Sequence, residues 1–394
     1  MTAAAIVPED FPWFDFSRYS FSLGLSLNGE AILSGHSASE YDRAEGRIVV
    51  NGGMAEQTRT AYAKIECILA AAGLGFEDVH HLVENVTVAG IGDYAAAEAV
   101  RANIFPSSSP VVNTVVVERL LRPAALIEIE VEAGLAAQSS ITDETFRPGY
   151  ADSRQAGGLV FLSTILPWNR EDERVGVGSL AEQTEMIYMN AAVILERYGL
   201  SLAHVALISE VLRPEALFEY DEVVRCRRKH LGPVYPAVHT VVQRCAALDQ
   251  EVLLACDIVA AGTVPTPIDP GWPLYAAAAV TPGVKAGRRL FISTQTGNDP
   301  VSGKQVSPGN VLAQAGTAYD NVNMVLNEAG LTPDSLIKTV EHVTGAGLES
   351  YKGVAEVRRK VLSEPYPAST GALCFGLLEP RMDFAVHATA VVGD

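Results

Sequence analysis

Short apolar runs alternate along the chain with longer segments in which apolar residues recur every three or four positions. Runs of four or five apolar residues bounded by Gly or polar residues predict strands, as in LVFLSTI (159–165) and RLFISTQTG (289–297). Segment 56–74 has the helical pattern, because four of its apolar residues fall on one face: Ala61, Ile65, Ile68 and Leu69. Gly73 stands where such a helix is expected to end.

The same pattern occurs three times along the chain. A Gln opens the predicted helix of each copy, and a Pro precedes a β-rich run in each. These markers are Gln57, Gln183 and Gln314, and Pro110, Pro236 and Pro367. In both series the second marker follows the first by 126 residues, and the third follows the second by 131. Two markers that keep the same pair of spacings indicate one supersecondary unit present in three copies.

Each copy has the predicted order strand, strand, helix, strand, helix, strand, strand. This order indicates a mixed sheet with two helices on one face. The other face also contains apolar runs, such as TVVVERL (114–120), so it must be buried, and the nearest partners are the other copies. We therefore predict an α/β protein of the α+β type whose three sheets face inward as an intramolecular pseudo-trimer. The predicted domains are 1–140, 149–262 and 273–394.

The segments outside the repeated pattern have their own composition. The connections 135–155 and 261–275 carry Gly and Pro, as domain boundaries do. The opening segment 11–20 holds five aromatic residues, which are expected either to staple the first domain or to line a pocket.

Composition narrows the function classes. Hydrophobic residues make up 48% of the chain and charged residues 19%, which is typical of a globular protein. The formal net charge of −18 argues against nucleic acid or an anionic membrane as partner, because such binding depends on clustered Lys and Arg. The five cysteines show no CxxC pair or Cys/His ligand spacing, so neither a disulfide framework nor a zinc site is predicted.

Motifs of the common cofactor and hydrolase classes do not occur. The sequence has no GxGxxG, phosphate loop, HExxH or GxSxG, so we expect no cofactor, no metal and no charge-relay hydrolase. It has no basic N-terminal region followed by an apolar run, and no stretch of about eighteen apolar residues. A cytoplasmic protein is expected.

The repeated unit resembles the RidA (YjgF) family. The resemblance runs through SGHS at 34–37, STQTG at 293–297, the QT-type helix opening, AGL after the first helix, the Pro marker, and IEIE at 127–130. It extends over about residues 20–133, 149–260 and 273–392. It implies a chorismate-mutase-like fold and ligand sites in clefts between subunits, which here become clefts between domains. A monomeric pseudo-trimer, or a homodimer of it, is the expected assembly.

The resemblance also implies an activity, the hydrolysis of reactive imines or enamines to a keto acid and ammonia. In the family an Arg two residues after the Pro clamps the substrate carboxylate. This chain has Val112, Val238 and Ser369 there. Because the guanidinium is missing from all three copies, we expect a substrate other than a simple 2-imino acid, such as a cyclic or aromatic metabolite.

A Glu in the last strand positions the attacking water in the family, and the matched positions here are Glu130, Asp257 and His387. All three can titrate, so they are the candidate acid–base residues. The candidate substrate-binding residues are His36, Thr114, Thr240, Arg244, Gln295 and Ser369. Arg244 is alternatively a partner in a surface or inter-domain ion pair. One Glu aligns in the central strand of every copy, and these residues are either catalytic or structural: Glu84, Glu210 and Glu341.

Three functions remain open at this point. The first is a cofactor-independent hydrolase or deaminase that acts on a C–N bond of a small molecule at an inter-domain cleft. The second, similar to chorismatases, is a lyase or hydrolase acting on a cyclic enol ether. The third is a non-catalytic module that binds a small molecule.

Overall fold

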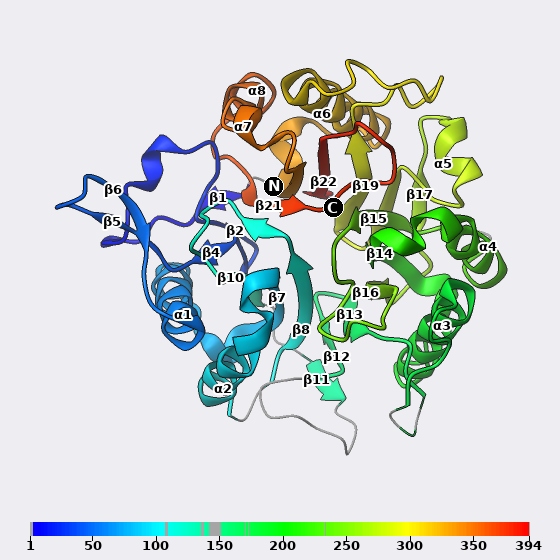
Figure 1. Ribbon diagram of the computed structural model, residues 1–394, viewed down its shortest axis with the longest axis horizontal. Helices are drawn as coiled ribbons and strands as arrows, with labels where there is room; N and C mark the ends of the chain where they lie inside the picture. The colour runs from blue at the N-terminus through cyan, green and yellow to red at the C-terminus, as the bar shows by residue number, and fades with distance from the viewer. Residues whose placement is uncertain are drawn as a thin grey trace.

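Three large sheets surround a common centre, and helices cover the outer side of each (Figure 1). The computed structural model describes residues 3–106, 109–134, 151–169, 171, 173–232 and 234–393, together with the backbone of 138–141. We refer to 3–134 as unit 1, to 138–262 as unit 2 and to 263–393 as unit 3. The mixed α/β architecture predicted from the repeats is therefore confirmed.

The first sheet belongs to unit 1. Its strands are, in spatial order, β1 (Ala4–Ala5), β2 (Gly24–Leu27), β3 (Glu30–Leu33), β10 (Ile127–Gly134), β7 (Val79–Thr87) and β8 (Val111–Val117), with β4 (His36–Ser37) also on β10. Strands β7 and β8 are parallel and the other pairs antiparallel. Strands β5 (Ser39–Asp42) and β6 (Arg47–Val50) form a separate hairpin. The covering helices are α1 (Met54–Ala71) and α2 (Tyr94–Ile104).

The second sheet repeats this order. Its strands are β11 (Gln138–Ile141), β12 (Ser153–Ala156), β13 (Leu159–Ile165), β16 (Leu254–Ala261), β14 (Val205–Leu212) and β15 (Ala237–Val242). Its helices are α3 (Leu180–Glu196) and α4 (Tyr220–His230). Strand β11, which the sequence division assigns to the first domain, pairs with β12 and so extends the second sheet.

The third sheet closes the ring. Its strands are β17 (Thr266–Ile268), β18 (Gly283–Ala286), β19 (Arg289–Thr296), β22 (Phe384–Val391), β20 (Leu336–Thr344), β21 (Ala368–Cys374) and β9 (Arg119–Leu120). Its helices are α5 (Pro273–Ala277), α6 (Val311–Glu328), α7 (Leu348–Tyr351) and α8 (Val354–Val361). Strand β9 comes from unit 1, so the two units share a sheet edge. Strand β17 lies in the expected connection 261–275.

Each unit has its own core between sheet and helices, and further apolar clusters join the units. The core of unit 1 contains Ile65, Leu82 and Ile129, and Phe11, Phe14 and Phe16 pack against it, so these aromatic residues staple unit 1. A cluster that contains Val111, Phe161 and Phe291 draws on all three units. The inner faces of the sheets are therefore buried against one another, as the apolar pattern predicts.

The repeated Pro and an aligned Ser build the same joint between units three times. Ser163 Oγ of unit 2 accepts from Val112 N at 3.0 Å and donates to Ala151 O at 2.6 Å, while Ala151 N donates to Pro110 O at 3.0 Å. The other two joints use Ser293 with Val238, Thr281 and Pro236, and Ser34 with Ser369, Ser22 and Pro367. Because the third joint links unit 3 back to unit 1, the ring is closed.

The repeated Gln has a structural role within each unit. Gln57 Nε2 donates to Ala124 O at 3.1 Å, and its Oε1 accepts from Leu126 N at 2.8 Å. Gln183 makes the equivalent pair with Glu251 O and Leu253 N, and Gln314 with Arg381 O and Asp383 N. In each unit the amide thereby fixes the turn before the last strand to the first long helix.

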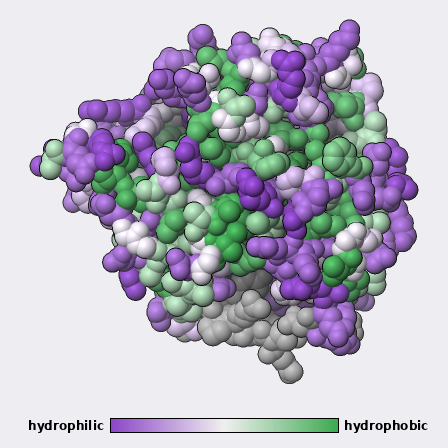
Figure 2. Space-filling model, in the orientation of Figure 1, coloured by the Kyte–Doolittle hydropathy of each residue, from purple (hydrophilic) through white to green (hydrophobic). Residues whose placement is uncertain are grey.

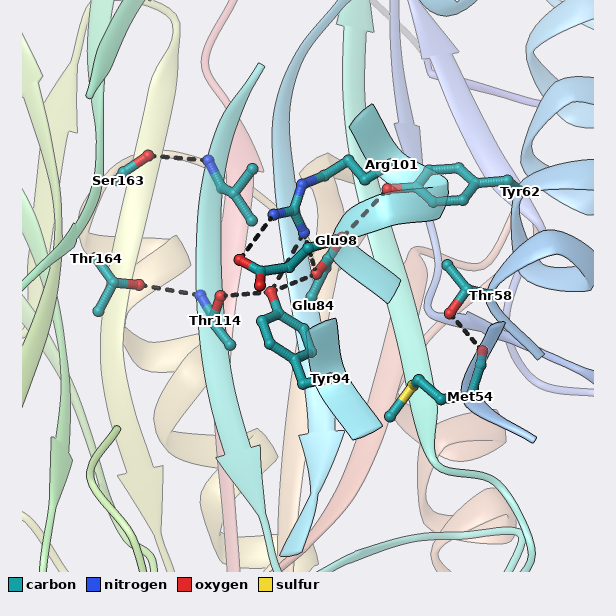
Figure 3. A network of polar contacts seen from close by, with 11 residues as sticks. Met54, Thr58, Tyr62, Glu84, Tyr94, Glu98, Arg101, Thr114, Ser163 and Thr164 are labelled. Carbon is teal, nitrogen blue, oxygen red and sulfur yellow. Dashed lines mark hydrogen bonds and ion pairs between the residues drawn. The ribbon is translucent and has the colours of Figure 1, made fainter. Parts of the chain in front are cut away.

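The aligned Glu of the central strand holds sheet and helices together. Glu84 accepts from Tyr62 Oη at 3.2 Å, Tyr94 Oη at 2.7 Å and Arg101 Nη1 at 2.6 Å (Figure 3). Glu210 accepts from Arg227 and Tyr220 in the same way. Glu341 accepts from Tyr319 and Tyr351 and forms an ion pair with Arg358 at 3.4 Å. The three carboxylates are at most 1% exposed. They therefore lie inside each unit, between sheet and helices.

The outer surface mixes polar and apolar residues. On the face in Figure 2, hydrophilic residues are interspersed with smaller apolar areas. Phe218, at the start of the α4 region, is the most exposed of the large apolar side chains described, at 94%. In the described part of the chain, no helix combines the length and the apolar composition that crossing a membrane requires.

Candidate functional site

A cavity of about 130 Å³ lies where the inner faces of the three sheets meet. Its lining includes the three candidate acid–base residues Glu130, Asp257 and His387, together with Lys338 and His342. Strand registers place the three candidates at one equivalent position, since each follows the residue paired with the aligned Glu of its unit. The structure therefore brings together around one cavity three residues that were expected in three separate clefts.

Each of these residues contacts a neighbouring unit through different chemistry. Glu130 Oε2 pairs with Lys338 Nζ of unit 3 at 2.7 Å. Asp257 Oδ1 accepts from Asn113 Nδ2 of unit 1 at 2.9 Å. The ring of His387 stacks on His239 of unit 2, with centroids 3.7 Å apart. An ion pair, an amide–carboxylate bond and a ring stack thus occupy equivalent positions at the three junctions.

Burial shifts the pKa values of Asp257 and of three histidines at this cavity. It raises the pKa of Asp257 to about 6, against the opposing effect of hydrogen bonds from Thr164 and Asn113. It lowers the pKa of His239 to about 3 and that of His342 to about 4, and it holds the pKa of His387 well below its usual range. The three imidazoles are therefore neutral at neutral pH.

A second candidate site lies where units 1 and 3 are in contact, in the region that the family resemblance makes an inter-domain cleft. The Glu128 carboxyl of β10 is half-buried and packs directly against Gly35, because a Cβ at that glycine would collide with Glu128 Oε1. Gly35 N donates to Thr370 Oγ1 of unit 3 at 3.2 Å. Tyr351 Oη lies against Gly371 in the same cleft, since it is the first atom that a Cβ there would meet. We refer to this region as the first cleft.

The first cleft has unusual acid–base properties. Burial and the neighbouring Glu130 raise the pKa of Glu128 to about 8, although Lys64 opposes the shift. Burial also lowers the pKa of Lys64 to about 7, against the attraction of Glu128. Lys64 Nζ donates to the carbonyls of Ser37 and Ser39 and lies 5.2 Å from the centre of the Phe14 ring. Both groups can thus exchange protons near neutral pH.

Only unit 1 has this pair. Ala255 and Ala385 replace Glu128, and Asn190 and Asn321 replace Lys64, in the other units. Sequence reasoning concentrated on positions that stay ionisable in every copy, so it passed over a carboxyl and an amine that are specific to one copy. The sequence signal for this pair is that unit 1 has Glu128 and Lys64 where the other two units have Ala and Asn.

Comparison with known proteins places the chain in a family. The model described as endoribonuclease L-PSP matches residues 16–135 and 273–392, more than half of the chain. The chain belongs to this family, the RidA (YjgF) family.

Curated relatives and solved structures support this placement. A 2-iminobutanoate/2-iminopropanoate deaminase of Capra hircus is 32% identical over 96 residues, which are 24% of this chain and 68% of the relative. An uncharacterised protein of Streptomyces coelicolor is 28% identical over 142 residues, which are 36% of this chain and all of that protein. A chorismatase structure covers 80% of this chain and 93% of its own, with a TM-score of 0.56 and 16% identity, which shows a shared fold.

The position that carries Arg in the RidA family has a structural role in two units here. Val112 and Val238 are at most 4% exposed and belong to the cores of units 1 and 2. Ser369 is half-buried in the first cleft, where its Oγ accepts from Thr339 Oγ1 at 3.3 Å. Of the three residues at the position of the family's Arg, Ser369 in the first cleft is therefore the one with a polar side chain.

Of the remaining candidate substrate-binding residues, Thr240 lines the cavity between the three sheets, whereas His36, Thr114 and Gln295 are not among its lining residues. His36 is 3% exposed and its Nε2 donates to Leu23 O at 3.0 Å, while Gln295 Nε2 donates to Ser293 O at 2.9 Å. Thr114 and Thr240 donate through their backbone N–H groups to Thr164 and Thr294 of the next unit (Figure 3 shows the first).

Arg244 lies away from both sites. Its Nη2 pairs with Glu118 of unit 1 at 3.1 Å, and its side chain is 57% exposed. Of the two roles considered for this residue, the structure shows the inter-unit ion pair. Among the described residues, no group of three His, Cys, Asp or Glu side chains has an arrangement that would hold a metal ion.

Proposed function

We propose that the chain hydrolyses the C–N bond of a small imine or its enamine tautomer in the first cleft, with Glu128 exchanging the protons. The observation that carries this proposal is a half-buried carboxyl group with a pKa of about 8, located between two units and beside hydroxyl groups. A general acid is most effective when its pKa is near the working pH. The RidA relative of Capra hircus, a deaminase of imino acids, supports the same reaction class.

The reaction needs one acid–base group. At neutral pH Glu128 is mostly protonated and donates its proton to the imine nitrogen, which makes the carbon electrophilic. The resulting carboxylate accepts a proton from the water that attacks this carbon, and a carbinolamine forms. Glu128 then returns the proton to the amine as the C–N bond breaks, and the resulting carboxylate takes the carbinolamine hydroxyl proton. A carbonyl compound and ammonia leave, and Glu128 is again protonated.

The substrate class follows from the missing guanidinium. In the first cleft Ser369 occupies the position of the family's Arg, and a hydroxyl cannot replace a bidentate charge-assisted pair. Loss of a hydrogen bond to a charged group costs about 1.5–3 kcal/mol, or roughly a tenfold to hundredfold weaker binding. The substrate is therefore an imine without a carboxylate next to the reacting carbon, oriented by the hydroxyls of Ser369 and Tyr351.

The test compares two imines generated in place by oxidases, one from alanine and one from a primary amine without a carboxylate. Release of ammonia is measured with and without the protein. We expect acceleration of the second hydrolysis and at most a weak effect on the first. Glu128→Gln should reduce kcat at least 100-fold, because Gln cannot transfer a proton.

Glu66→Gln is the matched control, since Glu66 is an exposed residue of α1. Full activity in Glu128→Gln would refute the assignment of this residue. Faster hydrolysis of the alanine-derived imine than of the other would refute the substrate class.

A further inference from the structure

The cavity between the three sheets has polar groups that the protein leaves without partners. His342 is 7% exposed and lines this cavity, and its ring nitrogens form no hydrogen bond within the described residues. His387, which is half-buried and also lines the cavity, likewise has ring nitrogens that form no hydrogen bond within the described residues. Buried polar groups are almost always hydrogen-bonded, so the buried His342 ring points to a polar partner in the cavity, either water or a ligand.

The charges of the lining favour a cation. Glu130, Glu132 and Asp257 face the cavity, and Lys338 is the lining residue of opposite charge. Glu130 is paired with Lys338 at 2.7 Å, and Glu132 lies 3.6 Å from Arg289. Asp257 forms no ion pair within the described residues: the neutral side chains of Asn113 and Thr164 donate to it at 2.9 and 2.7 Å, and His81, which is bound to Asn113 Oδ1, attracts it only when protonated. These carboxylates would repel an anion in the cavity, whereas a cation would neutralise the negative charge of Asp257.

The imidazoles restrict the cation further. A neutral imidazole has one nitrogen that accepts a hydrogen bond. His342 and His387 are neutral because burial lowers the pKa of both. A cation that carries N–H donors can therefore form hydrogen bonds with both kinds of group in this lining, the Asp257 carboxylate and a neutral imidazole nitrogen, whereas a bare metal cation has no hydrogen to donate.

The size of the cavity sets an upper limit on the ligand. Its volume of about 130 Å³ is close to the roughly 150 Å³ of an engineered protein cavity that holds benzene. A water molecule takes about 30 Å³ in the liquid, and an ammonium ion is of similar size. The cavity thus accommodates ammonium with a few waters, or a short primary amine.

We propose that this cavity is a binding site for a small ammonium cation, with Asp257 as the anionic partner and His342 and His387 as hydrogen-bond acceptors. The residues that line the cavity define this site. Its link to activity rests on the proposed function, because ammonia is the nitrogen product of that reaction. The cavity would then retain the product and inhibit turnover when ammonium accumulates.

The binding test uses thermal unfolding in chloride salts of ammonium, potassium and tetramethylammonium at equal ionic strength. Potassium has nearly the size of ammonium but no N–H donors, and tetramethylammonium has the charge without them. For a Kd of about 10 mM, 100 mM ammonium should raise Tm by roughly 1–2 °C relative to potassium. With ¹⁵N-labelled ammonium, a separate signal of protected N–H protons should appear in the NMR spectrum of the complex.

Variants locate the site. Asp257→Asn should abolish both the shift in Tm and the protected signal. His342→Phe keeps an aromatic ring of similar size and should weaken binding at least threefold, which keeps the test decisive if Asp257→Asn does not fold. Methylammonium and ethylammonium distinguish free ammonium from short amines as the preferred ligand.

The outcomes separate this proposal from the proposed function. Glu128→Gln, which lies in the first cleft, should lose turnover and keep the ammonium shift. An equal shift with potassium, or an unchanged shift in both Asp257→Asn and His342→Phe, would overturn the ammonium site. A shift that persists in a protein inactive on every imine would overturn the proposed function and leave the site standing.

Discussion

Ser163 of unit 2 accepts a hydrogen bond from the backbone N–H of Val112 in unit 1, at 3.0 Å. The same hydroxyl donates to Ala151 O at 2.6 Å, so one buried side chain holds both sides of a junction. The equivalent serines of the other junctions, Ser34 and Ser293, do the same. The serine at the end of this strand in each unit is thus a structural link between units.

Ser163→Ala should destabilise the protein, because it leaves the N–H of Val112 buried without an acceptor. The expected loss in the free energy of unfolding is about 1–3 kcal/mol, measured by urea denaturation. Ser34→Ala and Ser293→Ala should have similar effects. The exposed Ser302, replaced in the same way, is the control. Losses below about 0.5 kcal/mol in all three variants would contradict the structural role.

Glu84→Ala should be more damaging than the loss of a junction serine. It removes the carboxylate that pairs with the 2% exposed Arg101 at 2.6 Å, while Glu98 stays at 3.7 Å, and the loss of one partner of a buried ion pair costs about 3–5 kcal/mol. The double variant Glu84→Met with Arg101→Met should recover part of the stability, because neither charge then remains. A Glu84→Gln protein that is fully stable but inactive would instead make this carboxylate catalytic.

Stability should depend on pH through Glu128. Its pKa is about 8 in the folded protein and 4.5 in the unfolded chain, so the folded state binds more protons between these values. The contribution of Glu128 to stability is fully present below about pH 4.5 and is lost as the pH rises through about 8. Relative to the wild type, Glu128→Gln should therefore have a Tm that increases from pH 5 to pH 9, whereas Glu66→Gln should show no such trend.

The buried histidines should give stability the opposite pH dependence to Glu128, because their contribution is lost as the pH falls. Burial lowers the pKa of His239 to about 3 and that of His342 to about 4, so the unfolded chain binds more protons below pH 6.5. Their contribution is present above about pH 6.5 and is lost as the pH falls. His387→Phe keeps an aromatic ring for the stack on His239 and removes one histidine whose pKa is lowered by burial. The free energy of unfolding of this variant should therefore fall less than that of the wild type between pH 7 and pH 4.5. A fall equal to that of the wild type in urea titrations would contradict this.

Closure of the ring within one chain predicts the assembly in solution. The three junctions join unit 1 to unit 2, unit 2 to unit 3 and unit 3 to unit 1. Light scattering should give the mass of one chain, 41.9 kDa, or twice that value. A trimer of the full chain would show that the units pair between chains instead.

The sequence by itself determined the repetition, the order of strands and helices, and the position of the residues that hold the frame. These properties follow from local periodicity and from spacing, both of which can be read along one chain. The equivalence of Glu130, Asp257 and His387 was also predicted, and the strand registers confirm that alignment.

Only the tertiary structure decided what those residues face. Asp257 meets Asn113 and Glu130 meets Lys338 across more than one hundred residues of sequence, and no local pattern reports such a contact. Glu128 and Glu130 lie on the same face of one strand, yet one is in the first cleft and the other lines the cavity between the sheets. The difference arises because the packing of three units, each with its own surroundings, sets the burial and the charge around every side chain.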